Sequence, residues 1–135
     1  MASHTQAELE AVARDLWRDA PRGAVVWLSG ELGSGKTTFV QALTQAAGAA
    51  PARSPTFALV HEYPAPDGPL IHVDCYRLKH PDEALDLDLL GLAARARLLA
   101  IEWPERAGPH APLPHAHFRF AHADRATHRE LVRVA

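Results

Sequence analysis

The segment Gly30–Thr37 has the residue types and spacing of a loop that holds phosphate groups. Its letters, G-E-L-G-S-G-K-T, fit the pattern G-x-x-x-x-G-K-[ST] at every fixed position. Glycines allow the backbone to turn successive N–H groups toward a phosphate, and a helix that follows adds partial positive charge. In such loops the lysine, here Lys36, reaches the β- and γ-phosphates, and the final hydroxyl, here that of Thr37, is a ligand for Mg²⁺.

We therefore expect this loop to bind a nucleoside triphosphate, chiefly through the backbone amides of residues 33–38. The alternative is an ordinary glycine-rich turn between a strand and a helix, which seldom carries the complete motif in that setting. The residues predicted to contact the nucleotide are Glu31, Gly33, Ser34, Gly35, Lys36, Thr37 and Thr38.

Hydrolysis of a bound nucleotide needs an acid near the metal ion and a group that orients water. Asp74 and Glu102 each follow an apolar run typical of a buried strand, and ligand crevices open at the carboxyl ends of such strands. Either acid could anchor the metal ion; each could instead cap a helix or pair with a surface arginine. Thr56 lies where switch segments sense the γ-phosphate, although a plain loop threonine fits its position equally well. The predicted catalytic residues are Lys36, Thr56, Asp74 and Glu102.

The elements that must position these residues follow from the spacing of apolar residues. Thr5 and Glu8 have capping-box spacing ahead of an amphipathic stretch, and the apolar run before the loop is typical of a strand buried on both faces. The predicted helices are 5–19, 38–47 and 84–90, with 92–97 also helical; the predicted strands are 24–29, 56–63, 70–74, 98–101, 117–120 and 130–134. We expect antiparallel hairpins from 56–63 with 70–74 and from 117–120 with 130–134. The pattern predicts an α/β P-loop NTPase fold whose central mixed sheet has a parallel core, antiparallel edge strands and flanking helices.

Length and charge limit the class of protein further. The 135 residues are the size of one domain, so we expect residues 1–135 to form a single P-loop domain. The 14 Lys and Arg against 16 Asp and Glu give a formal net charge of -2, without the basic excess of proteins that clamp DNA or RNA. Any contact with RNA is therefore expected through a partner, and none with DNA.

The cysteine content favours a reducing compartment, and the histidines predict no structural zinc site. The single cysteine, Cys75, excludes an internal disulfide, and we expect it to be a small buried residue. No run approaches the roughly 20 apolar residues of a membrane span, so a cytoplasmic protein is expected. The nine histidines lack the spacing of a zinc site, although His115 and His117 would share one strand face.

Motifs that are absent narrow the kind of P-loop protein. No N-K-x-D segment is present to read guanine, and no L-S-G-G-Q segment marks a transporter-type ATPase. A small-molecule kinase stays open as an alternative, although the chain leaves little sequence for a lid. A nucleotide-gated adaptor that binds without hydrolysis is a third interpretation.

The loop and four further motifs resemble the TsaE (YjeE) family of bacterial ATPases. In chain order these motifs are Ser54-Pro55-Thr56-Phe57, His61-Glu62-Tyr63, His72-Val73-Asp74-Cys75-Tyr76-Arg77-Leu78 and Ile101-Glu102-Trp103-Pro104-Glu105. The loop alone is generic, whereas this set in this order is close to diagnostic. The resemblance spans about residues 5–134.

This resemblance implies a Mg²⁺-dependent ATPase, weak alone, that is required to form threonylcarbamoyladenosine next to the anticodon of tRNA. It implies ATP and Mg²⁺ as cofactors, with the metal ion held by Thr37 and Glu102 and with Thr56 in a switch-like loop. Asp74 and Trp103 would serve hydrolysis or coupling to a partner. The implied partner is the TsaD–TsaB complex, which hydrolysis would drive or reset and through which the protein would meet tRNA.

Overall fold

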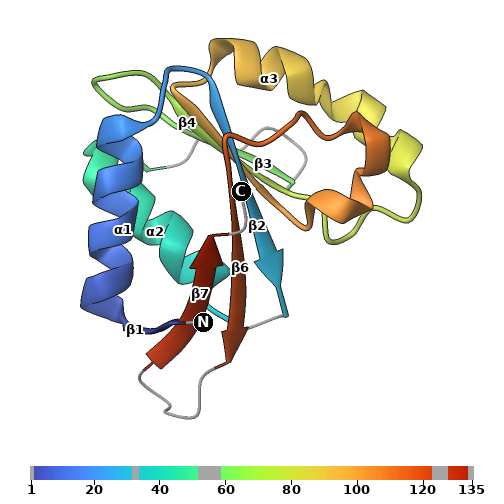
Figure 1. The fold of residues 1–135 in the computed structure, drawn as a ribbon. Coiled ribbons are helices and arrows are strands. Elements are labelled where there is room, and N and C mark those ends of the chain that lie inside the picture. Colours follow the sequence, from blue (N-terminus) through green and yellow to red (C-terminus); the bar gives the residue numbers. More distant parts are fainter. Residues whose placement is uncertain (1, 32–33, 52–58, 123–127, 134–135) are drawn as a thin grey trace.

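A seven-stranded mixed sheet organises the computed structural model, which describes residues 2–31, 34–51, 59–122 and 128–133. The strands are β1 (Ala2–Thr5), β2 (Ala24–Gly30), β3 (Val60–Tyr63), β4 (Leu70–Asp74), β5 (Leu98–Glu102), β6 (Ala116–His122) and β7 (His128–Arg133). Their order across the sheet is β1-β7-β6-β2-β5-β4-β3. Strands β6, β2, β5 and β4 are parallel neighbours, while β3, β7 and β1 extend the two sides in antiparallel pairing (Figure 1). The predicted α/β fold with a parallel core and antiparallel edges is confirmed.

Helices cover both faces of this sheet. The α-helices are α1 (Gln6–Asp19), α2 (Lys36–Ala47) and α3 (Leu89–Arg95), and the 3₁₀ helices are η1 (Pro81–Leu87), η2 (Pro104–Arg106) and η3 (Gly108–His110). Helices α1 and α2 lie together on one face, where Leu9 and Phe39 meet Leu28 and Phe118 of the sheet (Figure 1). Helix α3 and η1 pack on the other face against a second apolar cluster, in which Leu89 lies with Ile71 and Leu99 of the sheet. None of the described helices is both long and apolar enough to cross a bilayer.

Local sequence signals account for most of the element boundaries. The capping box at the start of α1 is present, since the Thr5 side chain accepts from the Glu8 amide at 3.2 Å and the Glu8 carboxylate accepts from the Thr5 amide at 3.0 Å. Helix α2 ends at Ala47 and is capped by Gly48, whose φ of +63° suits a glycine. The predicted hairpins of β3 with β4 and of β6 with β7 are confirmed. Strand β1 was not predicted, because its pairing with β7 joins opposite ends of the chain.

The predicted single helix at 84–90 is wrong, because Asp88 breaks it into η1 and α3. Asp88 adopts a left-handed conformation with φ of +50°, and its Oδ1 accepts from the Gly91 amide at 3.2 Å as the cap of α3. A Cβ on Gly91 would overlap this carboxylate, so the glycine permits the cap. Helicity at 92–97 is confirmed as far as Arg95.

Arg97, directly before β5, is a buried cation with 5% of its surface exposed. Its Nη2 donates to the Trp17 carbonyl at 2.5 Å, and its Nε donates to Asp67 Oδ2 at 3.0 Å. The hydrogen bond from Arg97 is the main reason that the pKa of Asp67 lies below its usual range. The guanidinium thus joins the last turn of α1 to the connection between β3 and β4.

We expect Arg97→Met to lower the free energy of unfolding by about 2 to 3 kcal/mol, because hydrogen bonds to charged groups contribute roughly 1.5–3 kcal/mol. Arg22→Met is the matched control, since Arg22 contacts the same Asp67 from an exposed position and exposed ion pairs contribute about 0–1 kcal/mol. Denaturation in urea measures both variants. Equal losses for the two would contradict the structural role given to Arg97.

Candidate functional site

The parallel strands bring the predicted site residues to one edge of the sheet. Strand β2 ends at Gly30, β4 ends at Asp74 and β5 ends at Glu102. The register pairs Asp74 with Glu102 on neighbouring strands, and Glu102 with Leu28 on β2. Two carboxylates that are distant in sequence therefore lie side by side, next to the start of the glycine-rich loop.

The loop between β2 and α2 begins at Gly30, which no other residue could replace without shifting the neighbouring backbone. Gly30 has φ of +143°, and a Cβ there would overlap the carbonyl oxygen of Phe120 and lie 3.0 Å from Ser34 Oγ. Gly35, with φ of +115°, ends the loop and immediately precedes α2. The two glycines thus permit a close approach of backbone to backbone and a turn into the helix amino terminus, as a phosphate cradle requires.

Ser34 presents a buried hydroxyl inside this loop. The residue is 0% exposed, and its Oγ has no hydrogen-bond partner within the described part of the chain. Its amide donates to the Glu31 carbonyl at 3.2 Å. Buried polar groups in native proteins nearly always have partners, so an unpaired hydroxyl in a phosphate-loop motif fits a site that a polar ligand completes.

Lys36 lies between the loop and the acids with 4% of its surface exposed. Its Nζ donates to the Gly30 carbonyl and lies 4.0 Å from the centroid of the Trp103 ring. Burial lowers the pKa of Lys36, while the negative charges of Glu102, Asp74 and Glu105 act in the opposite direction. The Lys36 ammonium group is thus held by the Gly30 carbonyl, by the face of the Trp103 ring and by the negative charge of nearby carboxylates. A phosphate could replace any of these partners or bind beside them. Thr37, exposed, and Thr38, half-buried, follow it in α2.

Glu102 is a buried carboxylate with a histidine partner. It is 5% exposed, and its Oε2 lies 2.5 Å from His72 Nε2. His72 is on β4, two residues before Asp74, so both side chains lie on the α1–α2 face of the sheet with Glu102. Sequence reasoning missed His72; the H-x-D spacing on a predicted strand was the signal that could have found it.

Asp74 and Trp103 flank this pair in half-buried positions. The Asp74 Oδ1 accepts from the Tyr76 amide at 2.9 Å in a turn, so it neither caps a helix nor pairs with an arginine in the described structure. Trp103 has φ of +56°, and its ring packs 5.0 Å from that of Tyr76. The Arg106 guanidinium lies over both rings. Trp103 therefore forms an aromatic wall beside Lys36.

Two predicted site residues have no described position. Thr56, with the rest of its S-P-T-F motif, and Gly33 lie outside the described residues. Within the described ranges, no group of three or more His, Cys, Asp or Glu side chains is placed to hold a metal ion. Cys75 is buried as expected, and burial is the main cause that raises the pKa of its thiol to about 12.

A second polar contact, which sequence reasoning also missed, lies on the opposite face of β2. Ser29 Oγ is 2.7 Å from His117 Nε2, and the Trp27 and His117 rings meet edge to face at 5.3 Å. Burial, together with the positive charge of Arg119, lowers the pKa of His117. The contact joins β2 to β6 behind the loop, and the lowered pKa of His117 favours the neutral form of its imidazole.

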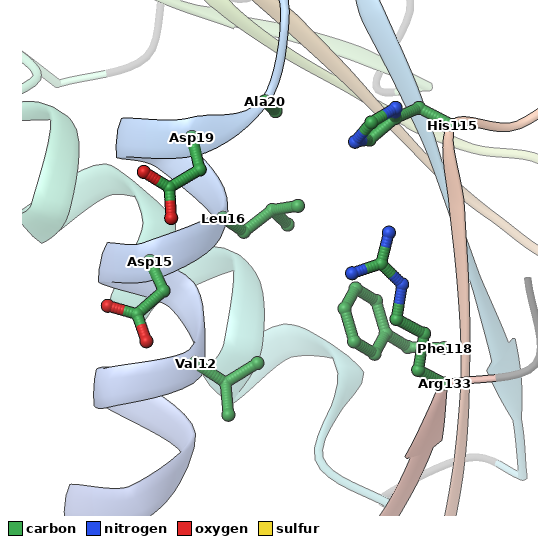
Figure 2. A pocket seen from close by; sticks show the side chains of 8 residues that line it. All are labelled: Val12, Asp15, Leu16, Asp19, Ala20, His115, Phe118 and Arg133. Carbon is green, nitrogen blue, oxygen red and sulfur yellow. The ribbon is translucent and has the colours of Figure 1, made fainter.

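His115 lies elsewhere, so the prediction that His115 and His117 share a strand face is wrong. Strand β6 begins only at Ala116, and His115 lines a cavity of about 350 Å³ between α1 and β6. Figure 2 shows His115 and Arg133 on the wall opposite α1, from which Val12 and Leu16 project. Because Gly30 pairs with Phe120 at the other end of β6, this cavity is separate from the phosphate loop.

A family model and curated relatives that this chain matches carry the same name, TsaE. Residues 3–131 match the family model described as threonylcarbamoyl adenosine biosynthesis protein TsaE. A protein of Nostoc sp. named tRNA threonylcarbamoyladenosine biosynthesis protein TsaE is 40% identical over 107 residues, covering 76% of this chain and 65% of the relative. A protein of Aquifex aeolicus with the same name is 44% identical over 88 residues, covering 63% and 61%. The chain thus spans less than two thirds of these curated relatives.

A solved structure is similar over nearly the whole chain. The crystal structure of Bacillus subtilis YdiB superposes with a TM-score of 0.76 at 25% identity. The similarity covers 96% of this chain and 80% of that one. The likeness extends over the sheet and both helical layers rather than over the loop motif alone.

We expect Ser34→Ala to stabilise the ligand-free protein by about 1 kcal/mol, because an unpaired buried polar group costs roughly 1–3 kcal/mol. The same change should weaken the binding of a nucleoside triphosphate. Ser29→Ala is the control, since its hydroxyl is paired with His117 and its loss should destabilise the protein by about 1 kcal/mol. Thermal denaturation with and without nucleotide measures both effects. A destabilised Ser34→Ala protein would contradict the unpaired state of this hydroxyl.

The lowered pKa of His117 predicts a pH dependence of stability. Above its usual value of 6.5 neither state binds the proton, so His117 contributes nothing. Below that pH the unfolded chain binds a proton more readily than the folded one, and stability is lost as the pH falls. His117→Gln keeps a side-chain nitrogen for Ser29 and should reduce this loss, whereas His115→Gln should not. Unfolding free energies at pH 7.5 and 5.5 provide the measurement; an unchanged loss in His117→Gln would disprove the assignment.

Proposed function

This chain belongs to the TsaE family, and from that premise we propose that it binds and hydrolyses ATP during the biosynthesis of tRNA threonylcarbamoyladenosine. The observation that carries the proposal is the position of Lys36, buried between a glycine-bounded loop and the neighbouring carboxylates Asp74 and Glu102. A cation in that position can face a triphosphate on one side and the metal-binding acids on the other.

The phosphates of ATP would be held by Lys36 and by the backbone amides of residues 33–38. Two observations of this chain fit that role: the unpaired Ser34 hydroxyl and the close backbone approach that Gly30 alone permits. On binding, Lys36 would exchange the Gly30 carbonyl for phosphate oxygens. Burial makes that exchange favourable, because a charge in a low-dielectric site interacts more strongly with an opposite charge than it does in water.

Glu102 and Thr37 would hold Mg²⁺, and Asp74 would orient the attacking water or the hydration shell. Mg²⁺ characteristically keeps several waters and takes only one or two carboxylates together with substrate phosphates, so a site with few protein oxygens fits it. When bound, the ion supplies neutralisation of the charge that develops on the phosphate oxygens. The protein's part is placement: Glu102 is held by His72, and Trp103 covers Lys36.

In the proposed reaction the bond between the γ-phosphorus and its bridging oxygen breaks while a water oxygen bonds to that phosphorus. The products are ADP and inorganic phosphate. Lys36 would stabilise the negative charge on the transferred group, and the Thr56 loop would respond to its presence or loss. Such reactions ask for positioning and charge stabilisation rather than covalent chemistry from the protein.

The proposed partner is the TsaD–TsaB complex, through which this chain would act on tRNA. A formal net charge of -2 supports a role without direct clamping of RNA. ATP hydrolysis, slow in the isolated chain, would drive or reset the complex between turnovers. A small-molecule kinase stays the alternative, and it would place the phosphoryl group on a metabolite instead of water.

We expect Lys36→Ala to lower ATP hydrolysis at least about 100-fold, the scale on which loss of one preorganised charge-stabilising group acts. Glu102→Gln should lower the rate similarly while ATP binding without Mg²⁺ persists. Lys79→Ala is the control, because Lys79 is the chain's other lysine and is exposed. Phosphate release is measured with and without TsaD–TsaB, and phosphorylated product is measured in parallel with candidate metabolites present.

Three outcomes of that experiment are decisive. Intact binding and hydrolysis in Lys36→Ala would refute the assignment of the loop. Phosphorylated metabolite formed faster than free phosphate would establish the kinase instead. No phosphate release even with TsaD–TsaB would make the chain a nucleotide-gated adaptor.

A further inference from the structure

We propose that His72 is a positioning residue that fixes the Glu102 carboxylate in the orientation needed for metal binding. The inference rests on the ATPase function proposed above. It concerns a side chain that does not belong to the loop and would touch neither the nucleotide nor the metal ion.

The contact between the two side chains is short and shielded from water. His72 Nε2 lies 2.5 Å from Glu102 Oε2, and the two side chains are 11% and 7% exposed. A carboxylate withdrawn from water is stable only when its oxygens find donors, because burial of an unpaired charge is costly. Within the described part of the chain, no other group donates a hydrogen bond to the Glu102 carboxylate. His72 is therefore the contact that determines the direction in which this carboxylate points.

The imidazole is itself fixed by the sheet. His72 occupies the middle of β4, where it pairs with Ala100 of β5, and Glu102 follows two residues later on the same face. On the other side His61 of β3 pairs with His72, and the two rings stack at 5.9 Å with an interplanar angle of 23°. The small side chain of Ala100 leaves room for the ring to lean toward Glu102. Three adjacent strands thus set the position of the donor nitrogen.

Holding one oxygen of Glu102 has a consequence for the other. With Oε2 bound by His72, rotation of the carboxylate is restricted, and Oε1 becomes the oxygen available to a cation. The carboxylate also faces the Lys36 ammonium, whose protonated form it stabilises. Without His72, Glu102 would be free to turn toward Lys36 and form an ion pair that competes with the metal ion. Outer-shell partners that orient ligands in this way commonly contribute about 10- to 100-fold in metal affinity.

The test compares three substitutions in the full chain, with Mn²⁺ as the paramagnetic probe. His72→Gln can keep a donor nitrogen near the position of Nε2, His72→Asn keeps an amide that is too short to reach Glu102, and His72→Leu removes the donor. Mn²⁺ binding is titrated by electron paramagnetic resonance in the presence of a non-hydrolysable ATP analogue. Affinity for the analogue without metal is measured in parallel, and exposed His115→Gln serves as the control.

We expect Mn²⁺ affinity to fall about 10- to 100-fold in His72→Leu and His72→Asn, while His72→Gln and His115→Gln stay within a few-fold of the wild type. Metal-free affinity for the analogue should be unchanged in all four. Unchanged Mn²⁺ affinity in His72→Asn would overturn the proposal, and so would equal losses of metal-free affinity, which indicate general damage. A wild-type chain that binds no Mn²⁺ with the analogue would refute the ATPase function as well, so the two failures are distinguishable.

Discussion

Parallel pairing of β2, β5 and β4 places the ends of three strands at one edge, and the candidate site depends on this arrangement. Parallel neighbours must be joined by crossovers, so their carboxyl ends meet on the same side. Gly30, Glu102 and Asp74 are the final residues of these strands. The first residue of the loop and both acids come from segments far apart in the chain. Each of them is positioned directly by the strand that it ends.

Burial of charge at this edge is balanced by specific contacts. Lys36 and Glu102 are both nearly inaccessible to solvent, and isolated charges there would be strongly disfavoured. In the structure, Lys36 contacts a backbone carbonyl and an aromatic ring, and the Glu102 carboxylate contacts His72. Ser34 is the exception, since its hydroxyl is left unpaired in the described structure. The polar groups of this site are therefore already in position before a ligand binds.

Two further polar contacts inside the molecule stabilise the scaffold. Arg97 joins α1 to the connection between β3 and β4, and Ser29 with His117 joins β2 to β6 behind the loop. The second contact fixes β2 against β6, and the last residue of β2 must approach the Phe120 carbonyl of β6 closely. A site assembled from strand ends can be no more rigid than the strands, so these contacts support its geometry.

The sequence by itself determined the features that depend on neighbouring residues: the Gly30–Thr37 loop between a strand and a helix, the capping box of α1, and the strands that end in Asp74 and Glu102. Tertiary structure alone decided the pairing of β1 with β7, the break at Asp88, and the partners of His72 and Arg97. Each of these joins residues from separate segments or depends on a left-handed backbone that apolar periodicity does not signal. A periodic pattern states which face of a strand is buried, whereas the neighbour that a buried polar group meets is decided by strand order and register.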